Sequence, residues 1–152
     1  MKHFKRIALL LLTLILLVTL IPSPEALAAK KSKKPYLSTR FKCIEKKTDQ
    51  LYDNAWTQYD MNMASAEEVS IWKKEIKKVY KKELNRISKK KVKQLKKEQK
   101  KWEKGMTAYA EKEASDCEGG SMYPLIYNLA QSSYIKKRIK KIIKKYGDIG
   151  NF

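Results

Sequence analysis

The stretch that decides the fold is residues 88–126, which read SKKKVKQLKKEQKKWEKGMTAYAEKEASDCEGGSMYPLI. Before the glycines, a single stripe recurs alternately three and four residues apart, at Val92, Leu95, Gln99, Trp102, Met106, Tyr109 and Glu113. This spacing predicts a helix from about Lys89 to Ser115 that packs lengthwise along a partner helix. Asp116 to Gly120 is typical of a turn, after which Ser121 can cap a new helix with Pro124 in its first turn.

A first helix is predicted upstream, over residues 38–56. Ser38 or Thr39 can cap it, and one stripe recurs at every fourth position, at Cys43, Lys47, Leu51 and Ala55. The last helix is predicted to run from Ser121 to Gly147, since glycine commonly ends helices. Its stripe contains Leu125, Ile126, Leu129, Ser133, Ile139, Ile142, Ile143 and Tyr146.

The helix between them, which ends near Ile87, has two possible starts. Thr57, with an acid three residues later, resembles a helix cap, whereas Ser65 with Glu68 is the better capping box. The sequence leaves both starts open. Neither Gly nor Pro separates this helix from the next one, but one continuous helix would be about 75 Å long. A domain of this size could hardly cover it, so a break is predicted at Ser88.

The order of these motifs resembles the family of the LprI-type lysozyme inhibitor N-terminal domain. The family pattern Leu-x-x-x-Gln-x-x-Trp is matched from Leu95 to Trp102, and its Gly-Gly-Ser is matched from Gly119. Segments 57–64 and 72–80 also look like family segments, and the match reaches Arg138 and Ile142, so it covers residues 57–142. The usual cysteine positions of the family are occupied here by Ala64, Ala110 and Ala130. The resemblance implies a small secreted helical protein that inhibits a lysozyme.

The chain begins with features of an export signal. A basic segment precedes an apolar run at residues 7–21, and residues 26–28 (Ala-Leu-Ala) match a small-x-small cleavage site. Residues 1–28 are therefore predicted to be a signal peptide that is cleaved after Ala28. The alternative is an uncleaved anchor, but the run is short for a membrane span of about 20 residues. The expected location is extracellular or associated with the cell wall.

The remainder is predicted to be one domain with short ends. Residues 29–36 lack apolar periodicity and are predicted to be a disordered basic arm. A single helical domain covers residues 37–147, and residues 148–152 form a tail. Its fold is predicted to be all-α, an irregular bundle of three to four helices. Since two cysteines in an oxidising compartment commonly pair, a disulfide between Cys43 and Cys117 is also predicted. Two free buried thiols or an intermolecular bridge are the alternatives.

The charge of the chain narrows the classes of partner. There are 35 Lys or Arg against 16 Asp or Glu, which gives a formal net charge of +19. The excess lies at residues 73–104, with 16 basic and 4 acidic side chains, and at residues 136–145, with 7 basic and none acidic. Such a surface attracts polyanions. Export favours anionic wall polymers or phospholipid head groups over nucleic acid, and membrane contact is expected only transiently, through the signal peptide.

Catalysis is not expected. The one histidine, His3, lies in the predicted signal peptide, so the exported protein lacks the residue needed for Ser-His or Cys-His nucleophiles and for the usual zinc sites. Most acidic residues alternate with Lys on helix faces, which is the pattern of exposed ion pairs. We therefore predict no enzymatic activity, no cofactor and no metal.

Two sets of residues are candidates for binding. Acidic and aromatic side chains adjoin the Gly-Gly turn, where a partner could dock: Glu111, Glu113, Asp116, Glu118, Gly119, Gly120, Ser121, Tyr123 and Tyr127. Exposed lysines on the central helix could hold a polyanion: Lys89, Lys90, Lys93, Lys96, Lys97 and Lys100. The structural alternatives are a simple chain reversal at the glycines and solvated lysine faces.

Other side chains are predicted to be structural. Gln99 lies on an apolar stripe and needs partners if buried, so we expect it to form a polar network with Arg138 and with Glu113. The alternative is that these residues line a binding cleft. Ala110 and Ala130 are expected to face each other across their two helices. The predicted core contains Trp72, Ile76, Tyr80, Leu95, Trp102, Tyr109, Leu125, Leu129 and Ile142.

The functional hypothesis follows from the resemblance and from the charge. The resemblance implies a secreted, non-enzymatic binding protein that acts like a lysozyme inhibitor. The alternative is a basic envelope protein that binds anionic cell-wall polymer or a membrane surface through its lysines. Because many lysozymes are themselves basic, long-range repulsion opposes the first hypothesis unless the partner meets the acidic segment 111–118.

Overall fold

A computed structural model describes residues 34–150 of the chain, and this region is all-helical, without a strand. The four longer helices are α3 (Lys42–Asp49), α4 (Gln58–Arg86), α5 (Lys89–Ala114) and α6 (Tyr123–Tyr146). Three short helical turns accompany them: η1 (Leu37–Phe41), η2 (Gln50–Tyr52) and η3 (Ser115–Cys117). The predicted all-α class is therefore confirmed. The predicted signal peptide and most of the predicted arm lie outside the described residues.

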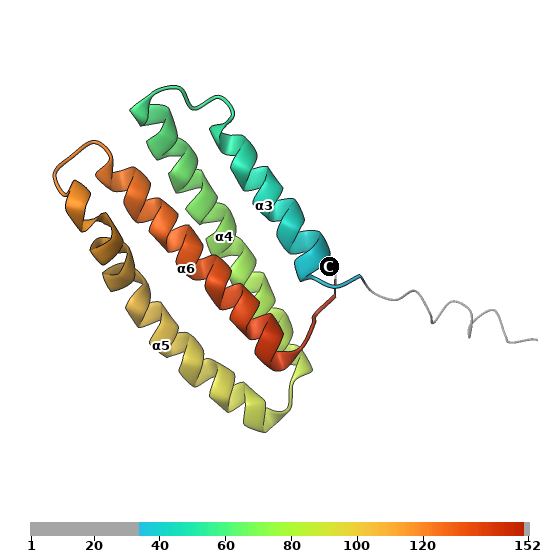
Figure 1. The fold of residues 1–152 in the computed structure, drawn as a ribbon. Coiled ribbons are helices and arrows are strands. Elements are labelled where there is room, and N and C mark those ends of the chain that lie inside the picture. Colours follow the sequence, from blue (N-terminus) through green and yellow to red (C-terminus); the bar gives the residue numbers. More distant parts are fainter. Residues whose placement is uncertain (1–33, 151–152) are drawn as a thin grey trace, which may run out of the picture. The chain divides into compact units, whose positions relative to one another are not determined.

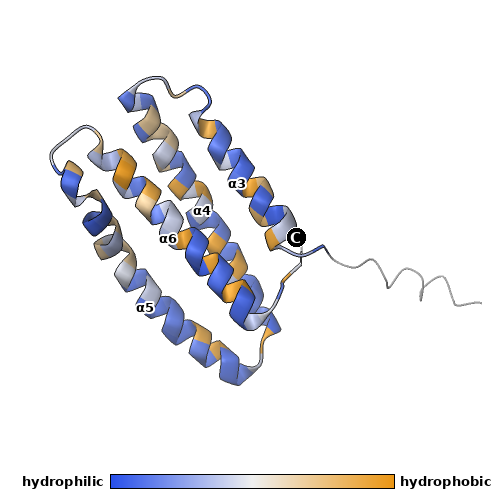
Figure 2. Cartoon of the chain, in the orientation of Figure 1, coloured by the Kyte–Doolittle hydropathy of each residue, from blue (hydrophilic) through white to orange (hydrophobic). Residues whose placement is uncertain are grey.

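The helices run up and down beside one another, and α6 packs against both α4 and α5 (Figure 1). The α3–α4 link and the α5–α6 loop lie at the same end, which we call the loop end. The break between α4 and α5 lies at the opposite end, which we call the turn end. In Figure 2 the portion of α5 nearest the turn end is largely hydrophilic.

The start of α4 is fixed by a capping box at Thr57. The Thr57 hydroxyl accepts from the Asp60 backbone N–H, and the Asp60 carboxylate accepts from the Thr57 backbone N–H. Two backbone donors of the first helical turn are satisfied in this way. The competing start is wrong, because Ser65 is buried inside α4 and its hydroxyl donates to the Asn62 carbonyl.

The predicted break at Ser88 is confirmed. Ile87 and Ser88 have extended backbone conformations between the last residue of α4 and the first residue of α5. Arg86 fastens the adjoining helix end, since its Nη2 donates to the carbonyl oxygens of Tyr146 at 2.6 Å and Gly147 at 3.2 Å. Gly147 ends α6 with a φ of +105°, a conformation that favours glycine.

The side-chain caps predicted for the first and last helices are not formed. The residue that precedes α6 is Met122 rather than Ser121, and no side-chain cap bond is formed there. Ser38 and Thr39 donate to the Pro35 carbonyl rather than capping a helix end. These hydroxyls make other local bonds or face solvent, so the helix starts there depend on tertiary packing.

The stripe predicted for the first helix is also wrong. Cys43 and Lys47 are exposed, whereas Phe41 and Thr48 are buried. The helical structure also ends at Tyr52 rather than near Trp56. A π-type turn precedes α3 and a 3-10 turn follows it, and both change the number of residues per turn. An extrapolated α-helical spacing therefore selects the wrong face.

The predicted Cys43–Cys117 disulfide is wrong, and both cysteines are free. Cys43 lies near the start of α3, at the turn end, whereas η3 carries Cys117 to the loop end (Figure 1). Two cysteines at opposite ends of a helical bundle lie too far apart for the short Cα–Cα separation that a disulfide requires.

The core lies between α4, α5 and α6. Its fully buried centre contains Trp72, Val79, Leu95, Ile135, Ile139 and Ile142. Of the predicted core residues, Tyr80 and Trp102 are partly buried against this cluster, Tyr109 is half-buried, and Leu129 is 38% exposed. The burial of Leu129 was mispredicted because α6 turns its buried face towards Ala130 and Gln131 instead.

Both ends of the domain take part in the packing. Tyr36, which we assigned to the arm, is fully buried, and Ile149 in the predicted tail is 5% exposed. The Tyr36 backbone N–H donates to the Asp148 carboxylate at 3.0 Å. The compact unit accordingly begins at Lys34. The folded domain is therefore longer at both ends than the apolar periodicity indicates.

Three aromatic rings join α5 to α6. Tyr134 stacks on Trp102, with ring centroids 5.5 Å apart, and on Tyr109, with centroids 4.9 Å apart. Gly105 lies beside the hydroxyl end of Tyr134, where a Cβ atom would come within 2.8 Å of the hydroxyl oxygen. Ala110 and Ala130, which we predicted to face each other, are both buried on these two helices.

We expect Gly105→Ala to destabilise the protein, although alanine is the better helix former by about 1 kcal/mol. The new methyl group collides with the Tyr134 hydroxyl, and the stacking of Trp102 and Tyr109 on the Tyr134 ring hinders the ring from moving away. Overpacking of this kind costs about 1–3 kcal/mol. The free energy of unfolding in urea measures the effect. In a Tyr134→Phe background the collision is gone, and the same substitution should become stabilising; equal effects in both backgrounds would contradict the argument.

Candidate protein-binding surface

A buried polar network fixes the register of α5 against α6. Arg138, which is 5% exposed, donates from Nε to the Gln99 Oε1 at 3.2 Å. Its Nη1 lies 3.5 Å from the Glu98 carboxylate, which also accepts from Lys145. Glu98 occupies the place that we gave to Glu113, which is exposed. These contacts hold two helices together, which is a structural role.

The ionisation of Glu98 reflects these contacts. Partial burial raises the pKa of its carboxyl group, but the hydrogen bond and charge of Lys145, together with Arg138, outweigh that effect. The net pKa is below the ordinary value, so Glu98 is ionised near neutral pH. The Glu98 carboxylate thus compensates the positive charge of the buried Arg138 guanidinium.

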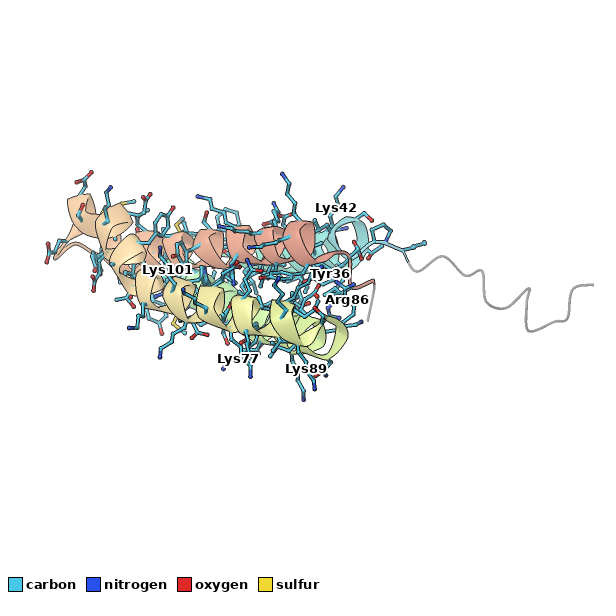
Figure 3. All side chains as sticks on the ribbon, turned by 90° about the horizontal axis from the view of Figure 1, so that it is seen from below. Tyr36, Lys42, Lys77, Arg86, Lys89 and Lys101 are labelled. Carbon is cyan, nitrogen blue, oxygen red and sulfur yellow. The ribbon has the colours of Figure 1, made fainter. Side chains whose placement is uncertain are left out.

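Charge is segregated along the bundle. Residues 48–72 contain five Asp or Glu and no Lys or Arg, and residues 105–135 contain four acidic residues and one Lys. Both segments belong to the loop half of the bundle. The basic segments 73–104 and 136–145 belong to the other half, and Arg86 and Lys89 lie at the turn end in Figure 3. A chain of net positive charge therefore presents one acidic end.

The same end carries the large apolar side chains that the fold leaves exposed. Among the described residues these are Trp56 at 83%, Tyr59 at 71%, Met63 at 55%, Met122 at 47% and Leu129 at 38%. The α3–α4 link, the first turns of α4, and the start of α6 supply them. Exposed apolar side chains gathered in one region and surrounded by polar ones commonly mark a binding site.

The two sides of the loop end are connected. The Asn62 side-chain amide of α4 donates to the Ser121 carbonyl in the α5–α6 loop at 3.1 Å. Tyr123 and Tyr127 stack on one another just beyond that loop, with ring centroids 5.8 Å apart. Gly119 has a φ of +76°, so the loop requires glycine there. These contacts hold the loop against α4, so that the surface is partly preorganised.

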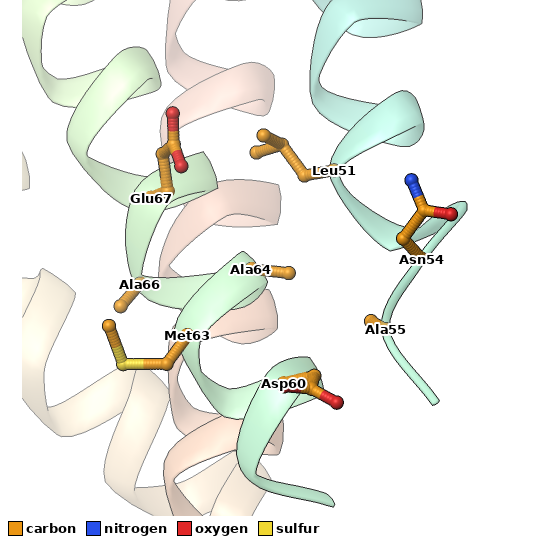
Figure 4. A pocket seen from close by; sticks show the side chains of 8 residues that line it. All are labelled: Leu51, Asn54, Ala55, Asp60, Met63, Ala64, Ala66 and Glu67. Atoms are coloured by element: carbon orange, nitrogen blue, oxygen red, sulfur yellow. The ribbon is translucent and has the colours of Figure 1, made fainter. Parts of the chain in front are cut away.

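A cavity of about 460 Å³ opens at the same end, between the α3–α4 link and α4 (Figure 4). Leu51, Ala55 and Met63 line it, together with the acidic residues Asp60 and Glu67. Hydrogen bonds from Thr57 lower the pKa of Asp60, so this carboxylate is ionised near neutral pH. An apolar hollow with acidic groups beside it suits a partner side chain that is long and cationic.

We define the loop-end surface by its exposed apolar and acidic residues, together with the partly buried Asp60: Trp56, Tyr59, Met63, Glu111, Glu113, Asp116, Glu118 and Met122. Of the predicted partner-binding residues, the four acids, Gly119, Gly120 and Ser121 are exposed, and Tyr123 and Tyr127 are half-buried. Sequence reasoning missed Trp56, Tyr59, Met63 and Met122. The absence of lysine from residues 48–72 of so basic a chain was the signal that could have found them.

The six predicted polyanion-binding lysines of α5 are all exposed. Within residues 34–150, no group of three or more His, Cys, Asp or Glu side chains is placed to hold a metal ion. In the same region of the chain, no helix is both long and apolar enough to cross a membrane.

The structure is that of a small helical protein with one candidate binding surface at its loop end. The sequence profile of the family described as lysozyme inhibitor LprI matches residues 43–142. The chain therefore belongs to the LprI family, and the match extends the resemblance upstream to include α3. No curated protein and no solved structure matches the chain significantly. The family is named for inhibition rather than for catalysis.

Proposed function

We propose that this protein is a secreted, non-enzymatic inhibitor that binds a lysozyme through the loop-end surface. Family membership supports the class of activity, and the concentration of exposed apolar side chains at the acidic end supports the location. Trp56 carries the argument, because a tryptophan that is 83% exposed contributes little to the fold. Large aromatic side chains are frequent energetic anchors of protein interfaces.

The distribution of charge removes the main objection to this function. A strongly positive net charge would repel a cationic lysozyme if it were spread evenly over the surface. Segments 48–72 and 105–135 instead make the loop end acidic, so a basic enzyme is attracted to this end and repelled by the other. Complementary charge of this kind mainly raises the association rate and sets the orientation.

The test is inhibition of a cationic lysozyme of the chicken type, measured from the clearing rate of a peptidoglycan suspension. The unmodified protein should slow clearing, and Trp56→Ala with Tyr59→Ala should raise the inhibition constant about tenfold or more. The matched control is Lys90→Ala with Lys93→Ala, two exposed α5 positions at the same spacing of three residues. This control should inhibit as well as the unmodified protein.

Two outcomes would contradict the proposal. Unimpaired clearing at micromolar concentrations of the unmodified protein would remove the activity, and equal losses in both double variants would remove the site. Circular dichroism of each variant excludes unfolding as the cause. Raising the salt concentration should slow association of the unmodified protein, because charges beyond about 10 Å are screened at 0.1 M.

A further inference from the structure

A second hollow lies between α5 and α6, on the basic half of the bundle. Its volume is about 620 Å³, and side chains of both helices line it, including Lys101, Trp102, Lys137 and Lys141. Residues of the loop-end surface do not contribute to it. We call it the α5–α6 groove. Its function is therefore separable from lysozyme binding.

Two buried hydrogen-bond donors in the wall of this groove have no acceptor. Arg138 uses Nε and Nη1 for Gln99 and Glu98, but its Nη2 has no hydrogen-bond partner among the described residues. The indole Nε1 of Trp102 is likewise buried without a partner. Buried donors are nearly always satisfied in folded proteins. Both donors belong to residues that line the groove, so a ligand that contacts this wall could supply the acceptor they lack.

The rim of the groove carries a regular series of cations. Lys137, Lys141 and Lys145 recur at every fourth residue of α6, so their positions cover about 12 Å of helix. Lys101 stands on the α5 side. The single carboxylate in the lining, Glu98, is already paired with Lys145 and Arg138. The lining is therefore strongly cationic, and its charges follow the helix axis.

The inner wall is aromatic. Trp102 and Tyr134 both line the groove and stack nearly parallel, with an angle of 13° between their planes. Such a wall offers apolar contact to the carbon backbone of a ligand, while the lysines above it contact the anionic groups. A small inorganic ion would use only the cations and would leave the aromatic wall uncovered.

We propose that the α5–α6 groove binds a segment of a phosphate-linked polyol or glycan chain. Lysine is a common phosphate ligand, and three lysines one turn apart match a chain with phosphates at regular intervals. The polyol carbons lie along Trp102 and Tyr134, and one phosphate oxygen accepts from Arg138. The series of cations over several turns favours a linear polymer over a single phosphate or lipid head group.

The three indole N–H signals of the protein provide a site-specific test. Poly(glycerol phosphate) oligomers are titrated into the ¹⁵N-labelled protein at physiological salt, with the signals of Trp56, Trp72 and Trp102 assigned by Trp→Phe variants. The Trp102 signal should shift and saturate, while those of Trp56 and Trp72 stay in place. A shift at all three, or at none, would overturn the proposal.

A matched pair of variants separates the groove from general charge. Lys137→Gln with Lys141→Gln should weaken binding about tenfold, whereas Lys93→Gln with Lys97→Gln, which removes the same charge at the same spacing from exposed α5 positions, should weaken it about threefold or less. Equal losses would mean diffuse attraction and would reject the groove. Inorganic phosphate binding as tightly as the polymer, or phosphatidylglycerol vesicles doing so, would replace the polymer by those ligands.

Discussion

Glu75→Ala should destabilise the protein by about 3 kcal/mol, because it removes the acceptor at the centre of a buried anchor. Glu75 is 3% exposed on α4 and accepts from the Tyr36 hydroxyl at 2.9 Å. It also accepts from Arg40, through Nε at 2.6 Å and Nη2 at 2.8 Å. The loss lies at the lower end of the range for buried pairs, because the Arg40 side chain is 25% exposed and can partly rehydrate.

The Tyr36 hydroxyl, by contrast, cannot rehydrate in this way. Its side chain is fully buried, and burial, together with the nearby charge of Glu75, raises the pKa of this hydroxyl far above its ordinary value. It therefore stays protonated and acts as a hydrogen-bond donor. Once Glu75 is truncated, the Tyr36 hydroxyl loses this acceptor in a buried environment, and the loss of a buried hydrogen bond costs about 1–3 kcal/mol.

Urea unfolding measures this loss, and two variants sharpen it. Glu67→Ala removes an exposed carboxylate from the same helix and should change the free energy of unfolding by less than about 0.5 kcal/mol. Glu75→Gln keeps an acceptor for Tyr36 and should cost less than Glu75→Ala. In hydrogen exchange, the amides of η1 and α3 should lose protection before those of α6. A Glu75→Ala variant as stable as Glu67→Ala would show that this anchor is dispensable.

The sequence predicted helices well where helix signals are local. The start of α4 at Gln58 follows from Thr57, whose capping box uses groups only three residues apart. The end of α6 was predicted from Gly147, because glycine tolerates the positive φ that the chain adopts there. The break near Ser88 followed from the size of the domain, since no local breaker marks it. These elements depend on contacts between residues close in the chain or on the length of the domain, and both can be read from the sequence.

Predictions that depended on long-range placement were less successful. The Cys43–Cys117 bridge was inferred from cysteine count and export, neither of which says at which end of the bundle a residue lies. The buried face of α3 was mispredicted because π and 3-10 turns flank this helix. The burial of Tyr36 depends on Glu75 and Asp148, which lie 39 and 112 residues away. No spacing rule covers contacts at such separations.

The candidate site was predicted only in part, for a related reason. The acidic residues from Glu111 to Glu118 form a visible cluster in the sequence. Trp56, Tyr59 and Met63 are apolar residues beside a helix start, and sequence alone does not distinguish an exposed one from a core residue. Exposure is decided by which face α6 covers, and that is a tertiary property. Antiparallel pairing of the helices then brings both groups to the loop end.

Trp72→Ala should destabilise the protein by about 3–5 kcal/mol, the usual cost of truncating a large aromatic side chain in a core. Trp72 is fully buried on α4, with the Phe41 ring centroid 4.9 Å away and the Lys136 ammonium 5.2 Å from its ring. Trp72 therefore packs α4 against both η1 and α6. Its removal leaves a cavity that helices on several sides would have to close.

Two further tryptophan variants divide this loss into its causes. Trp72→Phe should cost much less, because the buried Trp72 indole N–H has no hydrogen-bond partner among the described residues and phenylalanine retains an aromatic ring. Trp56→Ala deletes the same side chain from an exposed position and should change the free energy of unfolding by less than about 0.5 kcal/mol. Thermal and urea unfolding of all three variants measure this order. Inhibition of lysozyme should follow the opposite order under conditions where each variant is folded, with Trp56→Ala impaired and Trp72→Phe intact. If Trp56→Ala lost as much stability as Trp72→Ala, the exposed tryptophan would belong to the fold, and the binding surface would lose its principal residue.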